Sequence, residues 1–147
     1  MFFAVTLVVL FLDVLLKILA NRILSNAQTL PLINNFLHLT YIENYGSAFG
    51  FFRDQRLFLT LIGIIVCALV IYIYQRSSKR DNVIGFSFGL ILGGSLGNLI
   101  NRISMGYVID YVDFRMFPVF NLADVAINIG VAILMVEIFI RGKECFR

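Results

Sequence analysis

Two aspartates near the ends of apolar segments are the side chains best suited to chemistry. Asp110 lies in the β-branched and aromatic stretch 107–114, and Asp124 is one of the first residues of the next apolar run. Two carboxylates that share one proton can activate water against a peptide bond. Taken alone, Asp124 is more typical of a residue in the first turn of a helix that Asn121 caps. A second aspartate at the same expected membrane depth favours a catalytic pair.

A third carboxylate lies close to this pair in the sequence. The stretch 107–114 predicts a short strand or hairpin because of its β-branched and aromatic residues. Side chains alternate along a strand, so Asp110 and Asp113 are expected to point to opposite faces. Only one of them can face Asp124, and strand geometry alone leaves the choice between them open.

A charged pair also lies inside the first apolar segment. Asp13 and Lys17 are four residues apart, which places them on one face of a helix and allows an ion pair. Charges at membrane depth are costly and are candidates for function. We expect Lys17 to extend its ammonium group to the outer membrane surface. The pair is equally compatible with a structural role and with binding a lipid head group or ordering the site.

The composition is that of a membrane protein. Hydrophobic residues make up 60% of the 147-residue chain and charged residues 14%, against roughly 45–50% and 25% in soluble domains. A chain of this length cannot hide so much apolar surface from water, so lipid must surround it. The net charge of +3 therefore reflects basic residues at helix ends and does not indicate nucleic-acid binding. A single histidine, His38, expected in an extramembrane loop, leaves little to bind a metal, and no cofactor is expected.

Four apolar runs are long enough to cross a bilayer as helices, which takes about 20 residues each. We place them at about 3–21, 57–74, 83–101 and 122–140, in one integral membrane domain, 1–147, with outer loops 22–56 and 102–121. The first run lacks the basic start and the cleavage site of a removed signal peptide. In the third run, glycines at 85, 89, 93 and 97 predict close helix packing, which builds the scaffold.

The basic residues predict the orientation of these spans. Six of the twelve Lys and Arg residues lie in the short connection 75–82 and the tail 141–147. Basic segments of this kind stay in the cytoplasm. Both termini are therefore expected inside, and the two long loops that carry the candidate site are expected outside.

Five sequence blocks together resemble the lipoprotein signal peptidases (signal peptidase II). The blocks are Asp13-x-x-x-Lys17, Asn44-Tyr45-Gly46-Ser47-Ala48-Phe49-Gly50, Gly97-Asn98-x-x-Asn101-Arg102, Gly106-Tyr107-Val108-Ile109-Asp110-Tyr111 and Phe120-Asn121-Leu122-Ala123-Asp124. Each block is modest alone, but the five occur in order over nearly the whole chain. The resemblance implies an all-α membrane protein of the bacterial inner membrane. Its four transmembrane helices would carry a small extracytoplasmic β-rich cradle.

The resemblance also implies an aspartic endopeptidase whose catalytic dyad is Asp110 and Asp124, and it thereby selects Asp110 over Asp113. The supporting or substrate-binding residues that it implies are Asp13, Lys17, Asn44, Gly46, Asn98, Arg102, Asn121 and Ala123. The family's substrates are membrane-bound prolipoproteins whose cysteine already carries diacylglycerol. The signal peptide is cut just before that cysteine, and the cyclic peptide globomycin inhibits the reaction by occupying the dyad.

One departure and two alternatives remain open. Asn101 stands where the family usually has aspartate, so it offers no charge to Arg102. A small proton-coupled transporter would also suit four spans with intramembrane charge, but the spans show no two-half repeat. The other alternative is a non-catalytic lipid-binding subunit. The outer loop 23–54 is our candidate for a mobile cover over the substrate, with aromatic residues Phe36, Tyr41, Phe49, Phe51 and Phe52.

Overall fold

The computed structural model describes residues 1–25, 29–46, 56–77 and 81–141. Four helices and a three-stranded antiparallel sheet make up these residues: α1 (Phe2–Leu24), β1 (Thr29–Ile33), β2 (Leu37–Asn44), α2 (Arg56–Arg76), α3 (Asn82–Ser104), β3 (Val108–Asp113) and α4 (Leu122–Arg141). All four helices are long and apolar enough to cross a membrane. The expected fold class, four membrane-length helices with a small β-rich part, is confirmed.

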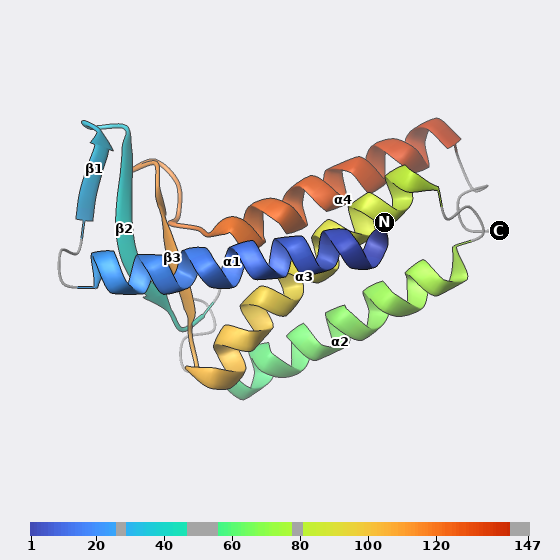
Figure 1. Ribbon diagram of the computed structural model, residues 1–147, viewed down its shortest axis with the longest axis horizontal. Helices are drawn as coiled ribbons and strands as arrows, with labels where there is room; N and C mark the ends of the chain where they lie inside the picture. Colours follow the sequence, from blue (N-terminus) through green and yellow to red (C-terminus); the bar gives the residue numbers. More distant parts are fainter. Residues whose placement is uncertain (26–28, 47–55, 78–80, 142–147) are drawn as a thin grey trace.

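The sheet and the helix bundle occupy opposite ends of the molecule. Figure 1 shows the sheet at one end, and the N-terminus, the end of α2 and the end of α4 at the other. Helix α3 is the central helix, because 78% of its apolar window is buried, against 28% or less in the other three. The outward apolar side chains of α1, α2 and α4 are exposed, as lipid-facing surfaces are.

Glycines let α3 approach α1 closely, as their spacing predicts. A Cβ atom added to Gly93 would lie 2.8 Å from the Thr6 carbonyl oxygen and 2.8 Å from the Val9 Cβ. At Gly97 the added atom would meet the Asp13 carboxylate. Gly85 is different, because its nearest neighbour would be 3.6 Å away, an ordinary contact. The glycines therefore bring the backbone of α3 against the polar pair of α1.

The sheet has the order β1-β2-β3. Its register places Ile42 opposite Asp110 and His38 opposite Asp113, with an irregularity between Leu39 and Ile42. Apolar side chains of the sheet pack on the last turns of α1, where Ala20, Leu24, Ile109 and Tyr111 form one buried cluster. This packing fixes β3, and with it Asp110, relative to the bundle.

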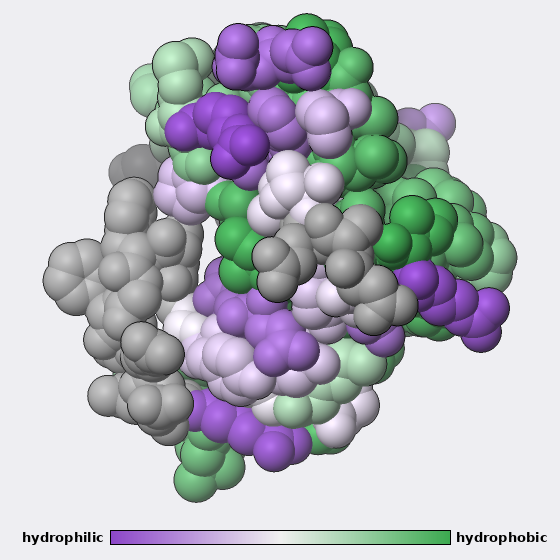
Figure 2. Space-filling view, turned by 90° about the vertical axis from the view of Figure 1, so that its left-hand side faces the viewer, coloured by the Kyte–Doolittle hydropathy of each residue, from purple (hydrophilic) through white to green (hydrophobic). Residues whose placement is uncertain are grey.

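The outer loop 23–54, the candidate cover over the substrate, contributes two of the three strands. Residues 29–44 form the β1–β2 hairpin, and Tyr41 lies on β2. Phe36, in the turn, packs edge-on against Phe114 with ring centroids 5.5 Å apart. Phe49, Phe51 and Phe52 lie outside the described residues. Figure 2 looks onto this end of the molecule, where hydrophilic residues gather beside apolar surface.

Candidate active site

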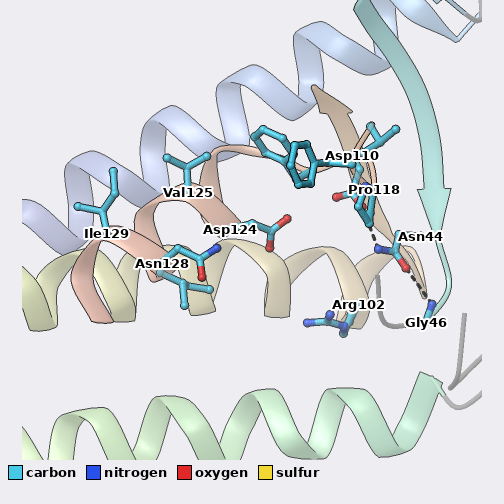
Figure 3. Close-up of a pocket in the computed structure, with 13 residues that line it drawn as sticks. Asn44, Gly46, Arg102, Asp110, Pro118, Asp124, Val125, Asn128 and Ile129 are labelled. Atoms are coloured by element: carbon cyan, nitrogen blue, oxygen red, sulfur yellow. Dashed lines mark hydrogen bonds between the residues drawn. The ribbon is translucent and has the colours of Figure 1, made fainter. Parts of the chain in front are cut away.

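Asp110 on β3 and Asp124 in the first turn of α4 face one cavity of about 680 Å³ (Figure 3). The polar part of its lining also includes Asn44, Gly46 and Arg102. The rest of the lining is largely apolar and comes from residues 117–120 and from the part of α4 that follows Asp124. Two carboxylates from separate elements thus line one mostly apolar pocket.

Asp113 has a different role from Asp110. Its Oδ2 accepts a hydrogen bond from the Thr40 hydroxyl at 2.9 Å, and its Oδ1 accepts one from the Arg115 backbone N–H at 2.7 Å. Burial opposes ionisation of Asp113, but these hydrogen bonds and the Arg115 charge outweigh it and lower its pKa. His38, expected in a loop, lies on β2 and accepts a hydrogen bond from Arg115 Nε at 3.2 Å. This cluster lies outside the cavity lining.

Amide side chains hold both oxygens of Asp110. Asn121 Nδ2 donates to Oδ1 at 2.6 Å and Asn44 Nδ2 donates to Oδ2 at 2.8 Å. Only 2% of Asp110 is exposed, and this burial raises its pKa to about 6. The hydrogen bond from Asn44 lowers the pKa, the negative charge of Asp124 raises it, and the bond from Asn121 lowers it again. Asp110 can therefore keep its proton at a pH where an ordinary aspartate has lost it.

Asp124 forms a reciprocal cap with Asn121 at the start of α4. The Asp124 backbone N–H donates to Asn121 Oδ1 at 3.0 Å, and the Asn121 backbone N–H donates to Asp124 Oδ2 at 3.3 Å. The predicted capping role of Asn121 is confirmed. The other carboxylate oxygen, Oδ1, accepts a hydrogen bond from Asn98 Nδ2 at 2.8 Å. The positive end of the α4 dipole favours a negative charge at this place.

A buried ion pair lies behind the two carboxylates. Lys17 Nζ lies 2.7 Å from Asp13 Oδ2 and donates to Asn98 Oδ1 at 2.8 Å. Only 2% of Lys17 is exposed, so the expectation that it extends to the membrane surface is wrong. Its ammonium group stays inside because the bundle supplies two partners that replace water.

The same layer connects α1 to α4. Asp13 Oδ1 accepts a hydrogen bond from the Ala123 backbone N–H at 3.0 Å. Asn98 Oδ1 also accepts a hydrogen bond from Asn121 Nδ2 at 3.3 Å. Ala123 is fully buried, and its carbonyl oxygen lies so close to Gly94 that a side chain at position 94 would collide with it.

All ten residues expected at the site therefore come together. Five line the cavity: Asn44, Gly46, Arg102, Asp110 and Asp124. The other five lie behind them: Asp13, Lys17, Asn98, Asn121 and Ala123.

Comparisons with known proteins identify the family. The family profile described as Signal peptidase (SPase) II matches residues 5–140. The lipoprotein signal peptidase of Halothermothrix orenii is 41% identical over 144 residues, which cover 97% of this chain and 98% of that one. The corresponding protein of Caldanaerobacter subterraneus is 40% identical over 135 residues, 91% of this chain and 92% of its own. The chain belongs to the signal peptidase II family.

A solved structure agrees with this assignment. It is described as a bacterial membrane enzyme, superimposes with a TM-score of 0.83 at 26% identity, and is matched over 92% of this chain and 90% of its own. Family membership and the four apolar helices make the chain a peptidase of a bacterial membrane.

The side chain of Asn101, which offers no charge to Arg102, contacts other groups. Its Oδ1 faces the Ile109 backbone N–H at 3.5 Å and its Nδ2 faces the Met105 sulfur at 3.9 Å. Adjacent residues on a helix diverge, so Asn101 contacts the turn between α3 and β3. Arg102 instead lines the cavity and brings a positive charge to Asp124 and Asp110.

Sequence reasoning missed one polar residue of the cavity, Asn128. Its signal was an isolated amide in a membrane span, one helical turn after Asp124. The sequence also did not reveal that residues 117–120 line the cavity, because nothing in their composition distinguishes them from an ordinary loop. Within the described ranges, no group of three or more His, Cys, Asp or Glu could hold a metal ion.

Proposed function

We propose that this chain is an aspartic endopeptidase that removes the signal peptide from diacylglyceryl-modified prolipoproteins, cutting just before the lipidated cysteine. The observation that carries this proposal is the pairing of Asp110 and Asp124 on one cavity, with the proton of Asp110 held to about pH 6. The relatives named lipoprotein signal peptidase support the class of substrate.

The first half of the reaction adds water to the scissile peptide bond. Ionised Asp124 takes a proton from a water molecule between the carboxylates, and the oxygen of that water attacks the carbonyl carbon. Asp110 gives its proton to the carbonyl oxygen at the same time. Arg102 places positive charge beside the site and holds the substrate main chain. A neutral tetrahedral diol results, with Asp124 protonated and Asp110 ionised.

The second half breaks the carbon–nitrogen bond. Asp124 gives its proton to the departing nitrogen, which becomes the amino group of the lipidated cysteine. Asp110 takes a proton from one hydroxyl of the diol as the carboxyl group of the signal peptide forms. The dyad returns to its starting state, so each turnover consumes one water and needs no cofactor.

The arrangement of the site suits a substrate held in the bilayer. The cavity continues from the dyad along the apolar side of α4, so the acyl chains of a lipidated cysteine can remain in lipid. By the positive-inside rule, both termini are cytoplasmic and the sheet and dyad lie at the outer face. In this proposal the chain 1–147 works as one membrane domain.

A cleavage assay with purified protein in detergent tests the proposal. We expect cleavage of a diacylglyceryl-modified prolipoprotein peptide, inhibited by globomycin. Asp110→Asn and Asp124→Asn should each reduce kcat/KM by at least about 100-fold, the usual scale of acid–base catalysis.

The matched control is Asp113→Asn, which should retain most activity because its carboxylate bonds to Thr40 and Arg115 outside the cavity. An inactive Asp113→Asn beside an active Asp110→Asn would refute the dyad. A transporter or a lipid-binding subunit would give no turnover in any variant.

A further inference from the structure

Asn128 is a polar residue at membrane depth that the proposed mechanism does not use. It lies on α4 one helical turn beyond Asp124 and lines the same cavity, as Figure 3 shows. It lies six positions after the start of α4 at Leu122, which is about 9 Å into the span. Its neighbours on the cavity wall, Val125 and Ile129, are apolar.

The amide of Asn128 is available for a ligand. The other three asparagines of the site each form hydrogen bonds with dyad carboxylates. Asn128 is exposed, and its side chain makes no hydrogen bond with another described residue. Hydrocarbon supplies no partner for an amide, so an unsatisfied amide at this depth is unfavourable. A bound substrate can supply what the protein does not.

The substrate main chain fits this amide better than the lipid does. An asparagine amide both donates and accepts hydrogen bonds, which matches a peptide group, whereas the ester of a diacylglyceryl group only accepts. A signal peptide must unwind where it is cut, and the unwound residues leave free N–H and C=O groups inside the bilayer. The apolar core of the signal peptide precedes the cut, on the membrane side of the dyad.

We infer that the Asn128 side-chain oxygen accepts a hydrogen bond from the substrate N–H of the second residue before the cut. The helical rise from Asp124 to Asn128 is about 6 Å, and an extended peptide advances about 3.3 Å per residue, which gives about two residues. This inference rests on the proposed function. It makes Asn128 a substrate-binding residue that helps keep the signal peptide unwound.

The first test is Asn128→Leu, assayed on the lipidated peptide in detergent. We expect kcat/KM to fall about fivefold to tenfold, the scale of one hydrogen bond in an apolar site. The fall should lie mainly in KM, because the bond is the same before and during the reaction. Tm should not fall, since leucine suits this depth. The control is Thr60→Val, which removes a hydroxyl from α2 outside the cavity and should leave activity unchanged.

Two altered substrates identify the bonded group. In the first substrate, an ester replaces the backbone amide whose N–H is expected to bond to Asn128. On this substrate, Asn128→Leu should lower kcat/KM by only about twofold or less. The other has ether-linked chains without lipid ester carbonyls, and here the loss should persist. Three results would each overturn the inference while the proposed function stands. The first is an Asn128→Leu variant as active as the wild type. The others are an activity loss in Asn128→Leu that stays complete on the backbone-ester substrate, or one that vanishes on the ether-lipid substrate. Failure of the wild type to cleave would overturn both.

Discussion

The two carboxylates of the dyad differ in the groups that surround them. Asp110 is almost fully buried on a strand, and this burial keeps its proton to about pH 6. Asp124 is partly exposed and shares a reciprocal cap with Asn121 at a helix N-terminus. Asn121 contacts both, since its amide also donates to Asp110. In the proposed mechanism, this asymmetry favours Asp110 as the acid and Asp124 as the base.

The assignment predicts how activity depends on pH. Asp110 must be protonated to donate, so kcat/KM should fall as pH rises through about 6. Asn44→Ala should move this fall to higher pH, because the lost hydrogen bond favours the ionised form of Asp110. Measurement of kcat/KM against pH for both proteins tests this. A fall that stays in place or moves to lower pH in Asn44→Ala would show that Asp110 is not the acid.

The free energy of unfolding should depend on pH in the same direction as the activity. The folded protein keeps the Asp110 proton to a higher pH than the unfolded chain, where the aspartate pKa is 3.8. The folded state therefore binds more protons between about pH 4 and 6, and stability falls as pH rises across this window. Asp110→Asn should remove this part of the pH dependence.

Helix α1 supports the site from the rear. Its ion pair bonds to Asn98 on α3 through Lys17 and to the first turn of α4 through Asp13. Removing one partner of a buried pair leaves an uncompensated charge, whereas removing both costs much less.

Lys17→Met should therefore lower stability by about 3–5 kcal/mol. The double variant Asp13→Asn with Lys17→Met should recover much of this loss, because no charge is left unpaired. Thermal unfolding in detergent measures both. A double variant as unstable as Lys17→Met alone would mean that the lost hydrogen bond from Lys17 to Asn98, and not the charge balance, accounts for the instability.

The glycines of α3 give a second prediction for the helices. Gly97→Ala should lower both activity and stability, because the added methyl group meets the Asp13 carboxylate and displaces the pair behind the dyad. A loss of about 1–3 kcal/mol is typical of such overpacking. Gly85→Ala is the matched control, since its new atom makes only ordinary contacts at 3.6 Å or more. Equal losses in the two variants would show that helix flexibility, and not the Asp13 contact, explains the effect.

The elements were predictable to different extents. The four helices follow from long apolar runs, because lipid leaves a spanning segment few other structures. The β1–β2 hairpin was hard to predict from the sequence. Pro31 interrupts β1, and proline is uncommon inside strands, so the segment does not have a typical strand pattern. The position of Lys17 was not predictable, because snorkelling and burial depend on partners that other helices supply. The contact between Asn101 and Ile109 was not predictable for a similar reason, because Ile109 lies on another element, β3.

At the scale of the whole molecule, the candidate site and the polar groups that support it lie at one end. The sheet, the dyad and the polar layer behind it lie where α1 and α3 end and α4 begins, while the N-terminus and the ends of α2 and α4 lie opposite (Figure 1). A lipidated prolipoprotein presents its cleavage site at the outer face of the membrane. The proposed function therefore requires the sheet end to be outside.

Reporter insertions test this orientation. A reporter enzyme active only outside the cytoplasm should be active when inserted at Asn35, in the β1–β2 turn, and inactive at Ser77, after α2. The two sites lie at opposite ends of the bundle, so they should give opposite results whichever way the protein faces; equal results would indicate misinsertion. Activity at Ser77 with none at Asn35 would place the dyad in the cytoplasm. In that case the carboxylates could not reach a lipidated cysteine at the outer face, and the basic residues of the connection 75–82 would not be setting the topology.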